Sequence, residues 1–273
     1  SIAPMRPLSV TTLAIAGLLT AACADLKTAK TAYQAEIDSP CELVDFWRFN
    51  VAFARQILAQ QPISGPGVWN RSDYRSLEGF VYAITPFNFT AIAGNLPTAP
   101  ALMGNTVVWK PAETQMLAAW EIYQLLEEAG FPPGVVNYIT NAPADAGVVV
   151  EAMVAHPAVR RVNFTGSTRV GRLIAMTCAK YLKPAVLELG GKAPMVILDD
   201  AVIEDAVNGA AFGCFANSGQ LCVSIERIYV VEKHYDEFLK AFVAETEAMK
   251  LGDGNDWEID MGPLISEKQF VRV

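Results

Sequence analysis

The sequence predicts an α/β protein in which a doubly wound parallel sheet is followed by part of a second α/β domain. Apolar, strand-like runs alternate with helix-like stretches from residue 80 to residue 250, which is the order of a βαβ protein. The runs are continuously apolar, as in parallel strands that helices cover on both faces. The 273 residues, of which 52% are hydrophobic and 18% charged, can build one large or two medium domains.

Before residue 80 the sequence predicts one helix and one loop. Ser39 is a candidate N-cap, with Pro40 at the first helical position and Glu42 closing a capping box. The helix then continues to residue 58. Its predicted apolar face comprises Phe46, Phe49, Phe53 and Ile57. Residues 60–79 hold two prolines and three glycines, which is typical of a loop.

Strands and helices then alternate up to residue 190. The expected strands are residues 79–85, 105–110, 134–140, 160–166 and 185–190. The expected helices are residues 113–130, 145–155 and 167–182, and residues 91–103 are helix-like or irregular. Together they predict one sheet with helices on both of its faces.

A change of pattern follows residue 190. Another strand, residues 194–198, comes with no helix before it, so a domain boundary is expected just after residues 187–191. This divides the chain into an atypical segment 1–26, a first domain 27–190 and a second domain 191–273. The second domain continues with a helix over 201–219, a strand over 226–231 and a helix over 234–250.

Charge and cysteine usage exclude several functions. The net charge is -8 and the pI is about 4.9, and without Lys/Arg clusters this disfavours nucleic acid and anionic membranes as partners. The five cysteines form no CxxC pair, and both histidines lie far from them, so no metal site is expected. Their scatter suits reduced thiols in the cytoplasm.

Two strand ends carry groups that suit a dinucleotide. In VVWKPAE, Glu113 could accept hydrogen bonds from ribose hydroxyls and repel a 2′-phosphate, and Lys110 could bond the same sugar. In NFTGSTRVG, the turn at Gly166 and Ser167 would present backbone N–H groups to a phosphate, with Gly171 in the first turn of the helix. The alternatives are a solvated charge pair and an ordinary βα turn.

Three further residues could carry chemistry. Glu188, in an apolar strand end before two glycines, could be a general base, or a glutamate that faces water. Asn88 in PFNFT could donate to an oxyanion or simply belong to a turn. Cys222, between a helix and a strand, could be a nucleophile or, like Cys214 and Cys178, a core residue.

The order PFN, KPAE, FTGSTxVG, LELGGK and GQxC resembles the NAD(P)-dependent aldehyde dehydrogenase superfamily from about Gln34 to Ile265. The resemblance implies a dinucleotide-binding domain over 27–190 and a catalytic domain over 191–273. It implies Cys222 as nucleophile, Glu188 as general base and Asn88 as oxyanion donor. It implies an NAD site, with NADP less favoured, that comprises Pro86, Phe87, Lys110, Glu113, Gly166, Ser167 and Gly171. It requires no metal.

The implied reaction is the oxidation of an aldehyde to an acid. Cys222 would add to the aldehyde, and Glu188 would activate the water that hydrolyses the resulting thioester. The stretches 31–50 and 78–111 look most like enzymes of L-glutamate γ-semialdehyde oxidation in proline breakdown. Later segments look like salicylaldehyde-type, general and succinate-semialdehyde members, and Val223 stands where the glutamate-semialdehyde group usually has serine.

The resemblance also implies that both domains are incomplete and that the full-length protein is a homo-oligomer. A chain of 273 residues is then expected to have little turnover alone. The alternatives are an inactive cofactor-binding remnant and a thioester-handling enzyme, such as an acylating dehydrogenase that depends on coenzyme A. Residues 5–23 imitate a lipoprotein signal, although a buried or truncated helix is favoured. The expected location is the cytoplasm, or the mitochondrial matrix in a eukaryote.

Overall fold

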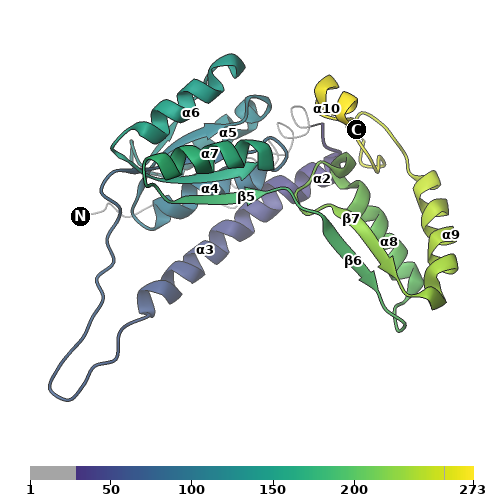
Figure 1. The fold of residues 1–273 in the computed structure, drawn as a ribbon, viewed down its shortest axis with the longest axis horizontal. Coiled ribbons are helices and arrows are strands. Elements are labelled where there is room, and N and C mark those ends of the chain that lie inside the picture. The colour runs from purple at the N-terminus through teal and green to yellow at the C-terminus, as the bar shows by residue number, and fades with distance from the viewer. Residues whose placement is uncertain (1–28, 255) are drawn as a thin grey trace. The chain divides into compact units, whose positions relative to one another are not determined.

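The structure, a computed structural model, describes residues 29–254 and 256–273 (Figure 1). The predictions about residues 1–26 therefore lie outside the described residues. The described chain divides into two compact units. The first is Asp38–Glu188, and the second joins residues 29–37 to Leu189–Val273. Residues 29–37, which the sequence analysis assigns to the first domain, thus belong to the second unit.

A five-stranded sheet in the order β3-β2-β1-β4-β5 forms the centre of the first unit. Its strands are β1 (Phe80–Thr85), β2 (Thr106–Pro111), β3 (Val136–Tyr138), β4 (Val159–Gly166) and β5 (Ala185–Leu189), whose last residue falls in the second unit. β1 pairs in parallel with both β2 and β4, and Ile84 lies opposite Lys110 on one side and Phe164 on the other. The predicted α/β fold with a parallel sheet is confirmed.

Helices cover both faces of this sheet. They are α4 (Thr90–Leu102), α5 (Met116–Glu128), α6 (Ala146–Ala155) and α7 (Thr168–Lys180). α4 contacts α5, and α6 contacts α7. Because the strand order reverses after β3, right-handed crossovers put these two pairs on opposite faces. The fully buried core residues include Tyr82, Trp109, Ile122 and Val162.

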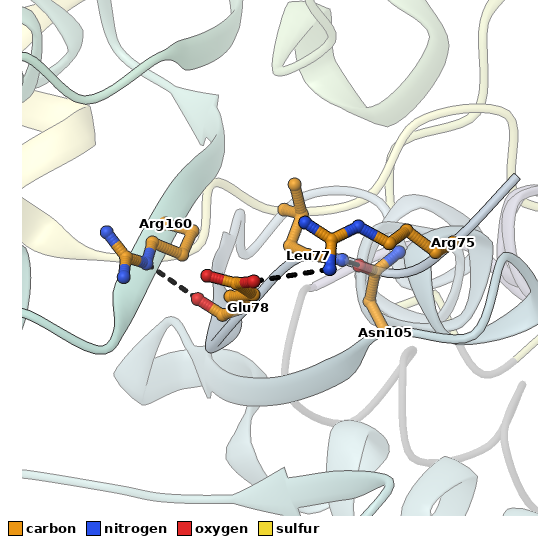
Figure 2. A network of polar contacts seen from close by, with 5 residues as sticks. All are labelled: Arg75, Leu77, Glu78, Asn105 and Arg160. Carbon is orange, nitrogen blue, oxygen red and sulfur yellow. Dashed lines mark hydrogen bonds and ion pairs between the residues drawn. The ribbon is translucent and has the colours of Figure 1, made fainter.

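Polar contacts tie together the amino ends of the strands (Figure 2). The Arg160 side chain, on β4, donates from Nε to the Glu78 carbonyl at 2.6 Å. The Glu78 carboxylate pairs with Arg75 at 3.2 Å. The Leu77 N–H donates to Oδ1 of Asn105, just before β2, at 2.9 Å. This network lies at the amino ends of the strands, whereas parallel folds bind ligands at the carboxyl ends.

The N-terminal helix begins earlier than the sequence predicts. α2 (Ala32–Glu36) is capped by Thr31, whose Oγ1 accepts from the Gln34 N–H at 3.2 Å. A π-helical turn, Ile37–Cys41, contains Pro40 and leads directly into α3 (Glu42–Ala59). The predicted start at Ser39 is therefore wrong. The wide π turn accommodates a proline that cannot donate to an ordinary helical turn.

The predicted apolar face of α3 is also not the face that packs. Phe49, Phe53 and Ile57 are 58%, 51% and 41% exposed. The contact of α3 with α4 is partly polar, since Trp47 Nε1 donates to Thr98 Oγ1 at 2.9 Å. Leu43, which is buried, fills the space above Gly94 in α4.

The second unit is built on a two-stranded parallel sheet, β6 (Ala193–Ile197) and β7 (Ile225–Val230). α8 (Ile203–Phe215) and α9 (Glu232–Ala248) pack on each other. Their core comprises Ile197, Ala206, Val207, Ala210 and Phe238. A last helix, α10 (Glu267–Arg272), which the sequence analysis does not predict, begins at the N-cap Ser266.

Candidate active site

The carboxyl ends of β1, β2 and β4 bring the predicted cofactor residues to one edge of the first unit. The strands end at Thr85, Pro111 and Gly166. Thr85 lies opposite Pro111 in the β1–β2 register, so the segments that follow these two residues start side by side. The strand order changes direction between β1 and β4, and ligands of doubly wound sheets bind outside such a point.

Lys110 and Glu113 form an ion pair at the end of β2. Lys110 Nζ lies 3.6 Å from Glu113 Oε1, and it also donates to the Pro111 carbonyl at 3.4 Å. The lysine side chain is only 6% exposed, while that of Glu113 is 35% exposed. A buried ammonium requires such partners, so Lys110 fixes the carboxylate at the rim of this edge. The alternative of a fully solvated pair does not hold.

A buried hydrogen bond supports the turn that carries Glu113. Glu113–Gln115 form a 3₁₀ turn, and Gln115 is fully buried. Gln115 Nε2 donates to Thr90 Oγ1, at the start of α4, at 2.6 Å. The turn after β2 is thus tied to the helix after β1, a support that the sequence analysis does not predict.

The turn between β4 and α7 is a helix N-terminus. Ser167 is the N-cap, with extended backbone, and its Oγ accepts from the Val170 N–H at 3.4 Å. Gly171 is buried in the first turn and donates its N–H to the Ser167 carbonyl at 2.9 Å. A Cβ on Gly166 would lie 2.6 Å from the Phe164 ring, so packing alone requires a glycine here. The helix N-terminus nevertheless offers N–H groups to an anion.

The segment between β1 and α4 holds the remaining predicted residues of this edge. Pro86 is buried, whereas Phe87 and Asn88 are half-buried in a bend. Phe89, which is buried, leads into α4 at Thr90. Asn88 therefore follows the carboxyl end of β1 by a few residues.

Glu188 lies near the end of β5, and its side chain is exposed. The neighbouring residues in the sequence predict apolar surroundings for Glu188, and the structure does not show them. β5 alternates between half-buried and exposed residues, and Glu188 falls on its exposed side. Glu188 is the last residue of the first unit.

Cys222 lies in the second unit, in a loop between α8 and β7. α8 ends at Phe215 and is followed by the 3₁₀ turn Ala216–Gly219. Cys222 itself is half-buried, and Val223 is 67% exposed. A Cβ on Gly191, just after β5, would lie 3.3 Å from the Cys222 carbonyl oxygen. Gly191, the second glycine of LELGGK, therefore lies against the backbone of the cysteine loop.

The other described cysteines have different surroundings. Burial raises the pKa of the Cys214 thiol. Burial likewise raises the pKa of Cys178, against the opposite effect of the nearby Lys183 ammonium. Cys41 is exposed on the π turn. Within residues 29–254 and 256–273, no cluster of three or more His, Cys, Asp or Glu side chains could hold a metal ion.

The structure thus collects Pro86, Phe87, Asn88, Lys110, Glu113, Gly166, Ser167 and Gly171 in the first unit. It places Cys222 in the second. The sequence analysis missed the residues that support the cysteine loop, above all Ser218 and Gln220. The feature of the sequence that could have indicated them is the polar run Asn-Ser-Gly-Gln immediately before Leu221 and Cys222.

The chain is similar to known proteins of one family. Residues 17–273 match the aldehyde dehydrogenase family. The chain is 43% identical over 253 residues to a mitochondrial delta-1-pyrroline-5-carboxylate dehydrogenase of Emericella nidulans, covering 89% of this chain and 44% of that protein. It is 42% identical over 244 residues to a vanillin dehydrogenase of Pseudomonas fluorescens, covering 85% and 50%.

A solved structure is similar over almost the whole chain. The delta-pyrroline-5-carboxylate dehydrogenase of Mycobacterium tuberculosis, crystallised with NAD, matches with a TM-score of 0.87 and 46% identity. The match covers 96% of this chain and 51% of that one. The chain thus spans about half the length of the relatives it matches.

Proposed function

This chain belongs to the aldehyde dehydrogenase family, and we propose that the protein oxidises an aldehyde to a carboxylic acid with NAD as cofactor. The observation that carries the proposal is the carboxyl edge of the first sheet. There the ion pair of Lys110 and Glu113 and the N-terminus of α7 follow neighbouring strands of a doubly wound fold. A ribose and a pyrophosphate require these two kinds of group.

The residues present fit NAD. Glu113 would accept hydrogen bonds from the adenosine ribose, with Lys110 beside it, and its charge would repel the additional phosphate of NADP. The N–H groups after Ser167 would hold the pyrophosphate. Pro86 and Phe87 would line the cofactor at the end of β1. The chemistry that NAD supplies when bound is the acceptance of a hydride.

Cys222 would carry the covalent chemistry. Its thiolate adds to the aldehyde carbon, and the carbonyl oxygen takes up the negative charge. The Asn88 amide and the Cys222 backbone N–H would donate to that oxygen. Oxidation leaves a thioester on the sulfur. Glu188 would take a proton from the water that hydrolyses the thioester and releases the acid.

The best candidate substrate is L-glutamate γ-semialdehyde. Its support is the identity of 43% and 46% to two pyrroline-5-carboxylate dehydrogenases. Aromatic aldehydes are the second candidate, because a vanillin dehydrogenase is 42% identical, and succinate semialdehyde is a third. Val223, exposed directly after Cys222, offers an apolar surface where a hydroxyl could otherwise contact a polar substrate.

Location and assembly are proposals of the same kind. No helix in the described part of the chain is both long and apolar enough to cross a membrane. We propose a cytoplasmic enzyme, or one of the mitochondrial matrix, as the name of the Emericella relative suggests. A homo-oligomer is proposed for the full-length protein.

The experiment measures NADH formation from glutamate γ-semialdehyde, succinate semialdehyde and benzaldehyde, together with NAD binding by calorimetry. NAD binding with turnover of one aldehyde supports the proposal. NAD binding without turnover of any aldehyde by the full-length protein would instead show an inactive cofactor-binding remnant. Turnover that requires coenzyme A would show an acylating enzyme.

A further inference from the structure

The loop before Cys222 has an unusual backbone. Asn217 and Ser218 have φ of 51° and 56°, and Gly219 follows with φ of 71°. Left-handed backbone is sparsely populated by residues with a side chain, and a run of such residues persists only where the surroundings fix it. The contacts that fix this run therefore also fix where Cys222 lies.

One group of contacts is local. Gln220 donates from Nε2 and from its backbone N–H to the Asn217 carbonyl, at 3.1 and 3.0 Å. Ser224, which is buried, donates from Oγ toward the carbonyls of Gly213 and Cys214, at 3.2 and 3.3 Å. These bonds join residues close in sequence, so they shape the loop and attach it to the end of α8.

A second group reaches across the unit to residues 262–265. Ser218 Oγ donates to the Gly262 carbonyl at 2.6 Å. The Ile265 N–H donates to Gln220 Oε1 at 3.1 Å. One side chain from the left-handed turn and one from the residue that follows it thus bond to backbone atoms about 45 residues further along the chain. Such bonds fix the loop relative to the rest of the unit.

Residues 262–265 are themselves held in place. A Cβ on Gly262 would lie 2.6 Å from the Ala29 carbonyl oxygen, so the backbone there packs tightly on the start of the described chain. The preceding Met261 accepts from the Gly252 N–H at 3.2 Å. Because residues 262–265 are held in place, their hydrogen bonds to Ser218 and Gln220 can fix the position of the loop.

We propose that residues 262–265 brace the loop of Cys222, and that Ser218 and Gln220 are positioning residues for the thiol. The proposal rests on the proposed function in one respect, that Cys222 is the reacting group. Release of the brace would let the loop open and expose the half-buried Cys222 sulfur more often.

The test measures the iodoacetamide alkylation rate of each cysteine in the full chain by peptide mass spectrometry. Ser218→Gly removes the donor but suits the left-handed backbone, and Ser218→Asn suits the same backbone and restores a donor. Gln220→Met removes the acceptor for Ile265. Ser266→Gly is the matched control, because Ser266 Oγ accepts from the Gln269 N–H and caps α10.

Ser218→Gly and Gln220→Met should each raise the Cys222 rate about fivefold, the factor for loss of one hydrogen bond. Ser218→Asn and Ser266→Gly should stay near the unmodified rate. Exposed Cys41 serves as the internal standard, and Cys214, at the end of α8, reports on loosening of the whole unit.

An unchanged Cys222 rate in Ser218→Gly would overturn the brace, as would equal increases for Cys214 and Cys222. If Ser218→Gly does not fold, Gln220→Met decides by the same criteria. Thiol labelling does not depend on turnover, so a failure of the proposed function shows separately. Aldehyde turnover that persists in Cys222→Ala would contradict the proposed function.

Discussion

At the scale of single residues, we propose that the ion pair of Lys110 and Glu113 determines which dinucleotide the first unit prefers. A carboxylate anchored 3.6 Å from a buried ammonium cannot easily turn away from a ligand at this edge. The residue types and their strand-end position could be predicted from the sequence. The burial of Lys110 could not, because it depends on tertiary packing around β2, including that of α4.

Glu113→Gln should lower the preference for NAD over NADP about tenfold, since one charge no longer repels the 2′-phosphate at short range. Glutamine keeps an oxygen for Lys110, so the fold should persist. Binding of both dinucleotides is measured by calorimetry. Glu128→Gln, on an exposed residue at the end of α5, is the control, and an unchanged NAD to NADP ratio in Glu113→Gln would refute the assignment.

The buried thiol of Cys178 should make stability depend on alkaline pH. Burial raises its pKa above the ordinary 9.0, so the folded chain holds a proton that the unfolded chain releases. The neutral thiol costs no stability below pH 9.0, and stability falls as pH rises toward and through the folded pKa. The midpoint of thermal unfolding should therefore fall less steeply above that pH in Cys178→Ala. Parallel slopes would contradict this.

At the scale of elements, the sequence predicts the strands and most helices, because buried parallel strands are continuous apolar runs. It fails at the start of the first helix. The Ser-Pro-Cys-Glu pattern matches a helix start, yet Thr31 caps the helix and Pro40 falls within a π turn. Local sequence determines which residues can cap a helix, whereas packing decides which one does so.

Gly79, before β1, is the glycine whose replacement should disturb the sheet most. Its φ is +121°, and a Cβ there would lie 2.2 Å from the Ala158 carbonyl oxygen, at the amino end where Arg160 bonds to Glu78. Gly79→Ala should cost about 2 kcal/mol or more of unfolding free energy, measured by urea denaturation. Gly65→Ala, where a Cβ would meet nothing within 4 Å, should cost little. Equal stability of the two variants would contradict the assigned strain.

The cysteine loop shows what sequence patterns leave out. Three successive left-handed residues are hard to predict, because Asn-Ser-Gly also forms ordinary turns. The partners that stabilise the run, Gly262 and Ile265, contribute backbone atoms only, and no side-chain pattern marks them.

At the scale of the whole molecule, the proposed cofactor-binding edge and Cys222 belong to different units. NAD binding should therefore survive Cys222→Ala with an affinity within about twofold of the unmodified chain, since no residue of the first unit changes. Calorimetry with NAD checks this. A loss of binding would show that the cofactor site extends to Cys222.

The most direct test of the proposed chemistry is NADH formation from glutamate γ-semialdehyde by the full-length protein carrying either Cys222→Ala or Cys214→Ala. Cys222→Ala should lower the rate by at least about 1,000-fold, because the covalent step is lost. Cys214→Ala should keep most of the activity, since Cys214 lies within α8. Turnover by Cys222→Ala at the unmodified rate would contradict a cysteine mechanism at this position.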